Sequence, residues 1–463
     1  MRGENVITIA ILIVLLCAAN GFAQEKPGAP KLTPREGMSQ SKGLPVLSLQ
    51  QGLRMVINQN RLVKIAERQQ QVRAAQTRIA LAPMLPEVNG SAGQTFLDHQ
   101  PKAMFNQFIV PESDKDYYSY SLSVSQTIFD FEGNASRYGA SKALLAASKY
   151  GTLQTKNLVA LRFAIAYFNL LESDKMVHVA KEEVARLKTH LADAQNLYTQ
   201  GVITKNDLLQ AEVRISDARR KLVDARNTRA IASSRVNSLL ARPLTTKFEP
   251  VDVPASVVFY NTAGQGKNKK PNLTQAWATA QKKRPELAVI AEDLKSLGLE
   301  KKAAKSEYFP RFFAQGGYDY TKNRYLTPNG NFSLLFGMNI NLYGGGITKA
   351  EIEQDEARKS RLLEQKDRVT DDIRLEVQTY ALDLEDALKR IEVTKDAVKQ
   401  AKENLRINKI RYEQGVGTAT DVIDALTLLT VAETNRYSAL YDFRKAEAGF
   451  LYAQGYDLAE VYR

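Results

Sequence analysis

The chain has 463 residues, 25% of them charged, and a formal net charge of +13 at neutral pH. This length suits two or three ordinary domains or one elongated architecture. The basic residues are spread among many acids, apart from the run Lys267 to Lys270, and no nucleic-acid-binding module is recognisable. We therefore expect no nucleic-acid partner.

The N-terminus has the features of an export signal. Val6 to Leu16 is an apolar run of signal-peptide length, and Gly21-Phe22-Ala23 has the small-x-small form of a cleavage site. We expect residues 1–23 to be a signal peptide and residues 24–46 to be a linker.

Cys17 is the only cysteine, so a disulfide framework is excluded. A lipid anchor on Cys17 stays open as an alternative, although the large Leu16 stands where a lipobox has a small residue. After the expected signal peptide no run approaches the roughly 18 to 20 apolar residues of a membrane helix, so entry into a bilayer would require strands.

Residues 47–242 are expected to form a first repeat. Its predicted elements are a helix over 47–82, strands over 87–97 and 117–129, and long helices over 134–200 and 202–242. The second strand shows strict alternation, because apolar side chains alternate with serine and threonine: Tyr118, Tyr120, Leu122, Val124 and Ile128. The polar stretch Asp98 to Asp116 is the predicted site of a loop insertion.

Residues 243–271, rich in Pro, Gly and Lys, are expected to be an equatorial linker, and residues 272–449 a second repeat. The second repeat has a predicted helix over 273–305, strands over 311–321 and 332–342, and long helices over 347–414 and 418–449. In its second strand the apolar residues again share one face: Phe332, Leu334, Phe336, Met338, Ile340 and Leu342. Residues 450–463 form a C-terminal segment.

Two similar segments mark the internal duplication. Tyr198 to Ala211 reads YTQGVITKNDLLQA and Tyr412 to Ala425 reads YEQGVGTATDVIDA, so half of the positions are identical. Each segment lies midway along a long helical pattern, which predicts a turn where one helix folds back on the next. The chain is therefore interpreted as a tandem repeat of a β-hairpin followed by a long helical hairpin.

The long helices require partners. Thr348 to Gln414 contains neither Gly nor Pro, and its apolar residues recur near heptad spacing: Leu362, Val369, Ile373, Val377, Leu384, Leu388 and Ile391. This stripe predicts coiled-coil packing. The fold class is thus predominantly helical α+β.

Four strands cannot close a membrane barrel, which needs about eight or more, whereas three chains would supply twelve. Tyrosine and phenylalanine near the strand ends would suit the membrane interface. A soluble sheet with one buried face is the alternative. The export signal and the flanking helices favour the barrel.

The order of these motifs resembles the TolC-type outer-membrane efflux protein family (outer membrane factors). The motifs that support the resemblance are the duplicated turn, Ala82-Pro83-Met84-Leu85-Pro86 and Tyr308-Phe309-Pro310 before the first strands, and Phe129-Asp130-Phe131-Glu132-Gly133 and Leu342-Tyr343-Gly344-Gly345-Gly346 after the second strands. The resemblance implies a homotrimer in the outer membrane of a Gram-negative bacterium. In this expected trimer, a 12-stranded barrel in outer-membrane lipid is joined to a coiled-coil tunnel in the periplasm.

The resemblance also implies a periplasmic gate. Thr204 to Asp207 and Thr418 to Asp421 fit a helix-capping pattern, and capping alone could explain both aspartates. In the family, acids matching Asp421 and Asp424 ring the pore. We expect these two to form carboxylate rings that favour cations, with Asp207, Gln210 and Tyr412 contributing hydrogen bonds nearby.

The turns themselves are expected to dock a periplasmic adaptor protein that connects to an inner-membrane pump. The predicted docking residues are Gly201, Val202, Gly415, Val416, Gly417 and Thr418. Some relatives carry a basic gate residue at the position of Gly417. Because this chain has glycine there, a gate salt bridge from this position cannot form. For the glycines, the alternative is that they only end helices.

No enzymatic motif is recognisable, since the chain has three histidines and neither an HExxH nor a GxSxG pattern. His178 and His190 are expected on helix surfaces. We therefore predict a non-enzymatic protein without cofactor or metal. The resemblance implies that it is the exit duct of a tripartite efflux or type I secretion system. A non-channel periplasmic or secreted coiled-coil scaffold is the alternative, and the transported substrate is not specified by the sequence.

Overall fold

The computed structural model describes residues 44–106, 108–252 and 272–462. The expected signal peptide, Cys17, most of the expected linker 24–46 and the run Lys267 to Lys270 lie outside these ranges. Pro45–Arg463 forms one compact unit.

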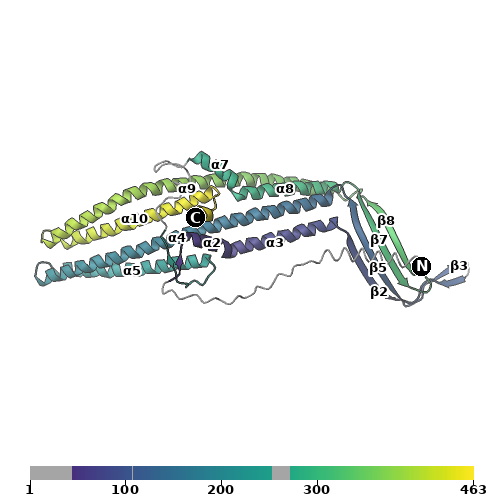
Figure 1. The fold of residues 1–463 in the computed structure, drawn as a ribbon, viewed down its shortest axis with the longest axis horizontal. Helices are drawn as coiled ribbons and strands as arrows, with labels where there is room; N and C mark the ends of the chain where they lie inside the picture. The colour runs from purple at the N-terminus through teal and green to yellow at the C-terminus, as the bar shows by residue number, and fades with distance from the viewer. Residues whose placement is uncertain (1–43, 107, 253–271, 463) are drawn as a thin grey trace. The chain divides into compact units, whose positions relative to one another are not determined.

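Two pairs of long helices dominate this unit (Figure 1). α4 (Gly133–Thr199) and α9 (Ile347–Glu413) each have 67 residues, and α5 (Lys205–Leu239) and α10 (Ala419–Ala453) each have 35. At 1.5 Å per residue the longer pair extends roughly 100 Å. α4 packs on α5 and α9 packs on α10, so the chain contains two antiparallel helical hairpins, and α10 also contacts α4.

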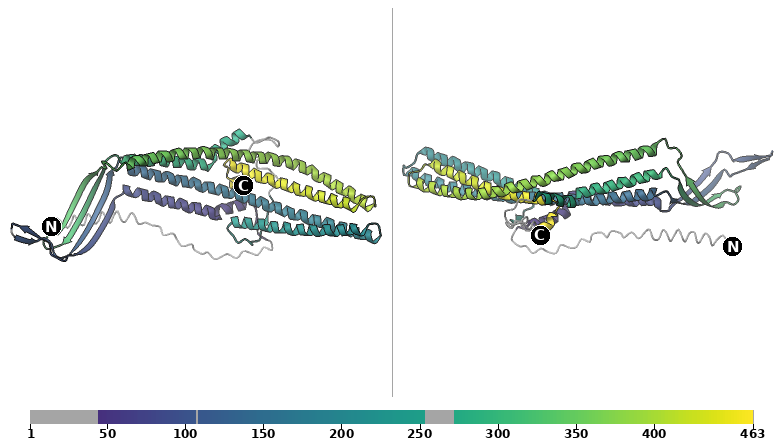
Figure 2. Two further views of the ribbon diagram at one scale, coloured as in Figure 1. Left: turned by 180° about the vertical axis from the view of Figure 1, so that it is seen from behind. Right: turned by 90° about the horizontal axis from the view of Figure 1, so that it is seen from above.

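Each long helix continues past its hairpin partner toward the strands. Along that part α4 contacts α3 (Arg61–Leu81) and α8 (Pro285–Ser306), and α9 contacts α8. Figure 2 shows the shorter helices beside the strand-proximal halves of α4 and α9. Part of the heptad stripe of α9 faces inward, since Ile373, Val377 and Leu384 are buried in a cluster with residues of α7 and α10, whereas coiled-coil packing stays a prediction.

The predicted single helix over 47–82 is wrong. The structure has two helices in this range, α2 (Leu49–Gln59) and α3, which meet at Asn60. Asn60 has extended backbone angles, and its side chain accepts a hydrogen bond from the amide of Leu62, so it caps the start of α3. The same side chain donates to the carbonyl of Leu239 at 2.8 Å, a long-range contact that local sequence does not reveal.

The predicted single helix over 273–305 is also broken. α7 (Leu273–Lys283) ends before Arg284, whose backbone is extended, and α8 begins at Pro285. Proline disfavours helical angles in the residue before it and is well suited to the first helical position. The break therefore has a local cause that the sequence contained.

The strands form one antiparallel sheet in the order β2-β5-β7-β8. Its strands are β2 (Glu87–Phe96), β5 (Asp116–Phe129), β7 (Arg311–Lys322) and β8 (Gly330–Asn339). Both predicted hairpins are confirmed, and the β5–β7 pairing joins them. β8 ends earlier than predicted, so Ile340 and Leu342 lie beyond it.

The register collects apolar side chains on one face of the sheet. Val88 pairs with Val124, Leu122 with Tyr318, and Tyr318 in turn with Phe332. The opposite face is mainly polar, although it also carries Phe313 and Leu335; its polar residues include Ser91, Ser121, Asp319 and Asn331. The apolar face is exposed within this chain, with Leu334 and Phe336 at 71% and 73% exposure.

The expected loop between β2 and β5 contains a further hairpin, formed by β3 (Lys102–Phe105) and β4 (Phe108–Pro111). Its apolar side chains are exposed, with Phe105 and Phe108 at 68% and 76%. The stretch predicted as the site of a loop insertion therefore contains regular structure with exposed apolar side chains.

The expected linkers take part in the fold. β1 (Val46–Leu47) pairs in parallel with β6 (Glu249–Pro250). The buried hydroxyl of Tyr167 lies 2.8 Å from the carbonyl of Leu47 and 2.7 Å from that of Val251, so its one proton is shared between these two acceptors. Residues 253–271 lie outside the described residues.

α10 continues four residues beyond the expected end at 449, and the C-terminal segment contains α11 (Leu458–Val461). No helix in the described ranges has the length and apolar content that a membrane crossing requires.

Candidate functional site

The two hairpin turns share one backbone geometry. Gly201 and Gly415 both have φ of +73°, a left-handed conformation that glycine adopts without steric cost. The amide of Val202 donates to the carbonyl of Leu197 at 2.9 Å, and the amide of Val416 donates to that of Arg411 at 3.0 Å. These bonds close a Schellman motif at the end of α4 and of α9.

The helices that follow begin with matching capping boxes. Thr204 Oγ1 accepts from the amide of Asp207 at 3.3 Å, and Asp207 Oδ2 accepts from the amide of Thr204 at 3.0 Å. Thr418 and Asp421 repeat this exchange at 3.1 and 3.0 Å. The capping interpretation is confirmed for both aspartates. The hydrogen bonds from Thr418 lower the pKa of Asp421.

Behind the turns the two hairpins share a small apolar core. Tyr412 lies in it with 4% exposure, packed among residues of α4, α5 and α10: Leu187, Ile215, Ala218, Ala419, Val422 and Leu426. Burial raises the pKa of Tyr412, and the negative charges of Asp207 and Asp193 add to that effect. The Tyr412 hydroxyl has no hydrogen-bond partner among the described residues, so the predicted hydrogen bonds near the gate stay a prediction.

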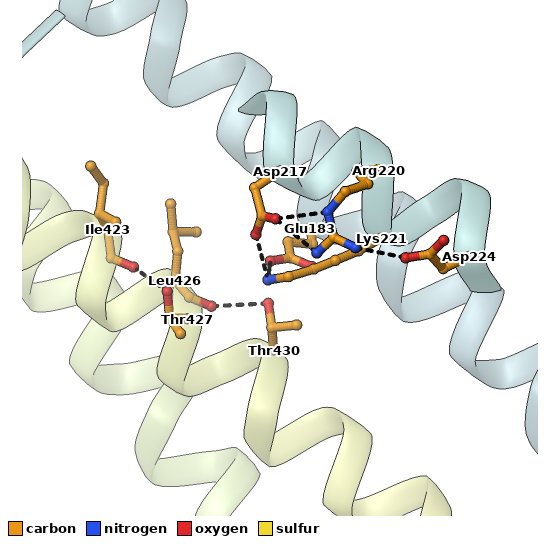
Figure 3. A network of polar contacts seen from close by, with 9 residues as sticks. All are labelled: Glu183, Asp217, Arg220, Lys221, Asp224, Ile423, Leu426, Thr427 and Thr430. Carbon is orange, nitrogen blue, oxygen red and sulfur yellow. Dashed lines mark hydrogen bonds and ion pairs between the residues drawn. The ribbon is translucent and has the colours of Figure 1, made fainter. Parts of the chain in front are cut away.

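A polar layer connects α4 and α5 further from the turns (Figure 3). Lys221 Nζ lies 3.3 Å from Glu183 Oε1 across the hairpin and 3.2 Å from Asp217 Oδ2 on its own helix. Burial alone would lower the pKa of Lys221, but the hydrogen bond to Asp217 and the charge of Glu183 raise it. On the facing part of α10, Thr427 and Thr430 bond to carbonyls of their own helix. The ionic contacts of this layer therefore hold one hairpin together.

Ion pairs between α4 and α10 link the two hairpins instead, among them Lys445 with Glu172 at 3.0 Å. A second pair, nearer the turns, joins Arg186 to Glu433. Arg186 of α4 lies 2.9 Å from Glu433 of α10, with side-chain exposures of 21% and 15%. Because the Arg186–Glu433 pair is largely shielded from water, removing one partner costs more than in an exposed pair, since the remaining charge is left shielded and unpaired. Separation of the two hairpins would break this ion pair.

The predicted acidic ring residues lie together on α10. Asp421 and Asp424 are exposed, and the exposed face continues with Leu428 at 51% and Val431 at 49% exposure. The spacing of three and four residues keeps all four on one side of the helix. Between them α10 buries Val422, against the shared core.

The remaining predicted site residues are distributed over the turns. Gln210 is exposed on α5, and Val202 and Val416 are exposed at 55% and 67%. Gly417 is tightly placed, since an added Cβ would lie 3.1 Å from the Tyr412 backbone nitrogen. The second turn thus leaves little room at this position.

The prediction for His190 was wrong. His190 is 4% exposed and packs against Tyr412 with ring centroids 5.3 Å apart, whereas His178 is exposed as expected. Burial lowers the pKa of His190; the charge of Asp193 opposes this and Lys409 adds to it. The sequence signal that could have predicted this burial is the spacing of His190 from Leu187 and Ala194, which places all three residues on one helix face.

The family model for outer membrane efflux proteins matches residues 52–242 and 277–453, which together make up more than half of the chain. The chain belongs to this family. The resemblance to TolC-type proteins is confirmed, as are the outer-membrane location and the predicted role as an exit duct for efflux or secretion. The family is one of transport proteins rather than enzymes.

Individual efflux and secretion proteins are similar over most of their length. The alkaline protease secretion protein AprF of Pseudomonas aeruginosa is 23% identical over 354 residues, covering 74% of this chain and 71% of that protein. The outer membrane protein TolC of Vibrio cholerae is 22% identical over 374 residues, covering 78% and 80%. The solved structure of CusC superposes with a TM-score of 0.76 at 16% identity, covering 91% and 96%.

Proposed function

We propose that three copies of this chain form a tunnel whose strands close into a twelve-stranded barrel and whose helices build a gated periplasmic duct. The observation that carries the proposal is the sheet of this single chain. It exposes a continuous apolar face, exemplified by Leu334 and Phe336, and ends in two long edges, β2 and β8. An open sheet of this kind requires partners for both its edges and its apolar face.

The strand lengths fit a membrane wall. β2 and β8 have 10 residues and β7 has 12, close to the ~9–11 tilted residues that cross a bilayer. The apolar face would contact lipid and the polar face would line the lumen, as in membrane barrels. The recurrence of 67- and 35-residue helices in both halves supports the tandem-repeat interpretation.

The gate proposal concerns α10. Three copies of its exposed stripe around an axis would bring Asp421 and Asp424 into two stacked carboxylate rings. Asp421 would do so while capping α10, since its Oδ2 already accepts from the Thr418 amide. Carboxylate rings favour cations over anions. Opening would require the α9–α10 hairpin to move from α4, a shift between two packings that a partner could bias.

The turns are proposed to receive the helical tips of a periplasmic adaptor, which connects in turn to an inner-membrane pump. Val202 and Val416 support this, because each turn presents one strongly exposed apolar side chain on a loop whose glycine and valine amides are hydrogen-bonded to the preceding helix. Such small apolar knobs suit a helix-tip contact. Large substitutions at Gly415 that fold and still support efflux would count against docking there.

Barrel closure can be tested by disulfide scanning across the β8–β2 edge. The natural sequence has one cysteine, Cys17, inside the expected signal peptide, so the background is clean. Ser91→Cys in β2 is combined with cysteine at each odd-numbered position of β8, because Ser91 and those positions share the polar face of the sheet.

We expect one pairing to give a covalent trimer on a denaturing gel, since Cα atoms across a paired strand fall within disulfide range. Leu334→Cys, on the opposite face, is the matched control and should not crosslink to Ser91→Cys. A chain that stays soluble without detergent, with no crosslink at any position, would favour the scaffold alternative.

The gate is tested separately by single-channel recording of Asp421→Ala and Asp424→Ala. Loss of cation preference in the double variant is expected. Unchanged conductance and selectivity would refute the ring assignment.

A further inference from the structure

The β3–β4 hairpin carries exposed apolar side chains on both of its faces. Consecutive residues of a strand point to opposite faces, and residues that pair directly share a face. Met104 and Ile109 pair and lie on one face, whereas Phe105 and Phe108 pair and lie on the other. Their exposed fractions are 75%, 62%, 68% and 76% in the same order. Both faces of the hairpin therefore need a partner that this single chain does not supply.

Polar contacts hold the base of the hairpin in place. Asp114 Oδ1 lies 2.8 Å from Arg324 Nε, and Asp114 Oδ2 accepts from the Arg324 amide at 2.9 Å. Asn323, which is 6% exposed, donates to Ser113 Oγ at 2.9 Å and accepts from the Asp114 amide at 3.2 Å. These contacts tie the segment after β4 to the segment after β7, so the hairpin starts from a defined point at the end of the sheet.

The hairpin lies beyond the end of the sheet that is farthest from the helices (Figure 1). Seen from above in Figure 2, it leaves the sheet toward the side opposite the C-terminus. On the C-terminal side, α11 and α2 pack on α4. Three copies of these short helices inside the proposed duct would obstruct it, so their side is the outer one. The hairpin therefore leans toward the axis of the duct.

The hairpin is long enough to reach that axis. Twelve strands about 4.8 Å apart and tilted by about 40° enclose a barrel with a radius of about 12 Å. Each strand of the hairpin has four residues, which extend about 14 Å at about 3.4 Å per residue. Phe105 and Phe108 are the pair at the tip. Three hairpins that lean inward from the rim would thus bring these aromatic rings together.

Two features favour other copies of the hairpin as the occupant of its faces. A ring of three gives each member two neighbours, one for each face, whereas packing on a single surface covers only one. Lys102 on β3 and Glu112 after β4 are exposed, and neither forms an ion pair within the described ranges. In a cyclic head-to-tail ring the β3 side of one hairpin meets the β4 side of the next, which places these opposite charges across each contact.

We propose that the β3–β4 hairpins of three copies pack against one another across the outer mouth of the barrel and form an apolar cluster there. This proposal rests on the proposed trimeric barrel. The cluster is stabilised because it removes the exposed side chains of both faces from water. It narrows the exit of the duct at the end opposite the turns of the helical hairpins.

The test uses single-cysteine variants of the full chain in lipid nanodiscs, oxidised with copper phenanthroline. Phe105→Cys and Phe108→Cys should each form a disulfide between copies. Up to about two thirds of the chains should migrate as a dimer on a denaturing gel, because a disulfide joins two of the three copies. Both positions are exposed, so these substitutions leave the fold intact.

Phe332→Cys is the matched control, because Phe332 is a phenylalanine with 60% exposure near the same end of the sheet, but on its apolar face. Its three copies would stand about 20 Å apart around the barrel, well beyond disulfide range. This variant should stay monomeric on the gel. Dimer formation in Phe332→Cys equal to that of the hairpin variants would mean random collision and would overturn the proposal.

The β8–β2 disulfide trimer, measured in parallel, separates the two proposals. If that trimer forms and neither hairpin variant gives a dimer, the cluster is refuted and the barrel stands. If that trimer does not form, the barrel is refuted and the cluster with it. A bimane label on Met104→Cys should resist quenching by doxyl lipids, and strong quenching would identify the bilayer as the occupant and overturn the cluster.

Discussion

The Arg186–Glu433 ion pair gives the sharpest test of how the hairpins are held closed. Glu433→Gln keeps the shape of the side chain but removes the charge that faces Arg186 at 2.9 Å. Exposed ion pairs contribute about 0–1 kcal/mol, and breaking a fully buried pair costs about 3–5 kcal/mol. With exposures of 21% and 15%, the pair lies between these limits.

We take about 1.5–2 kcal/mol as the contribution of this pair to the closed packing. If opening separates α10 from α4, losing the pair shifts the closed–open equilibrium by about 13-fold to 30-fold. Open probability in planar-bilayer recordings of Glu433→Gln should rise accordingly. Arg186→Gln should have a similar effect, and the double variant should add little to either, because both remove one interaction.

Asp224→Asn is the control, since it breaks the Arg220–Asp224 pair, which lies within α5 at exposures of 63% and 64%. Such a pair contributes only about 0.3–0.5 kcal/mol and does not connect the hairpins. An open probability for Glu433→Gln within about twofold of the natural chain would refute the reasoning. So would an equal increase in Asp224→Asn.

Three further predictions concern stability. Gly449→Ala should destabilise the chain by up to about 2 kcal/mol, because the new Cβ would lie 2.2 Å from Tyr380 Cε1 and overpacking outweighs the gain in helix propensity. Gly151→Ala should stabilise the chain by up to about 1 kcal/mol, because its Cβ would meet nothing within 4 Å. Urea unfolding measures both changes. Gly415→Ala should cost about 1–2 kcal/mol through its positive φ rather than through a clash, and equal stability would contradict the left-handed turn. Burial lowers the pKa of His190 from its ordinary value of 6.5, so the unfolded chain binds a proton more readily than the folded chain. The free energy of unfolding is therefore highest above that pH and declines as the pH falls. His190→Leu should flatten this decline in the melting-temperature profile between about pH 7.5 and about pH 5.5.

Much of the local structure could be predicted because its causes are local. A glycine with positive φ and a Thr-x-x-Asp box are encoded within a few residues, so the turns at Gly201 and Gly415 and the caps at Thr204 and Thr418 followed from the sequence. Strand alternation likewise predicted the apolar face, because side chains on a strand alternate between faces regardless of the partner.

The candidate site could be predicted only in part. Asp421 and Asp424 were proposed from the resemblance to the family, and the structure shows both exposed on α10, while their role as ring residues stays a prediction. His190 was misjudged because a polar residue on a long charged helix is usually solvated, and only the approach of α9, with Tyr412 against its ring, buries it. A pocket beside His190 is lined by residues of α4, α9 and α10, so it has no sequence signature.

By itself, the sequence determined where the chain turns, caps and alternates, since these depend on backbone angles and hydrogen bonds between near neighbours. Only the tertiary structure decided that β5 pairs with β7, that Asn60 interrupts a helix while bonding to Leu239, and that Arg186 bridges to Glu433. These contacts join residues far apart in the chain. Their formation depends on which faces meet when the long helices pack, and no local pattern specifies that.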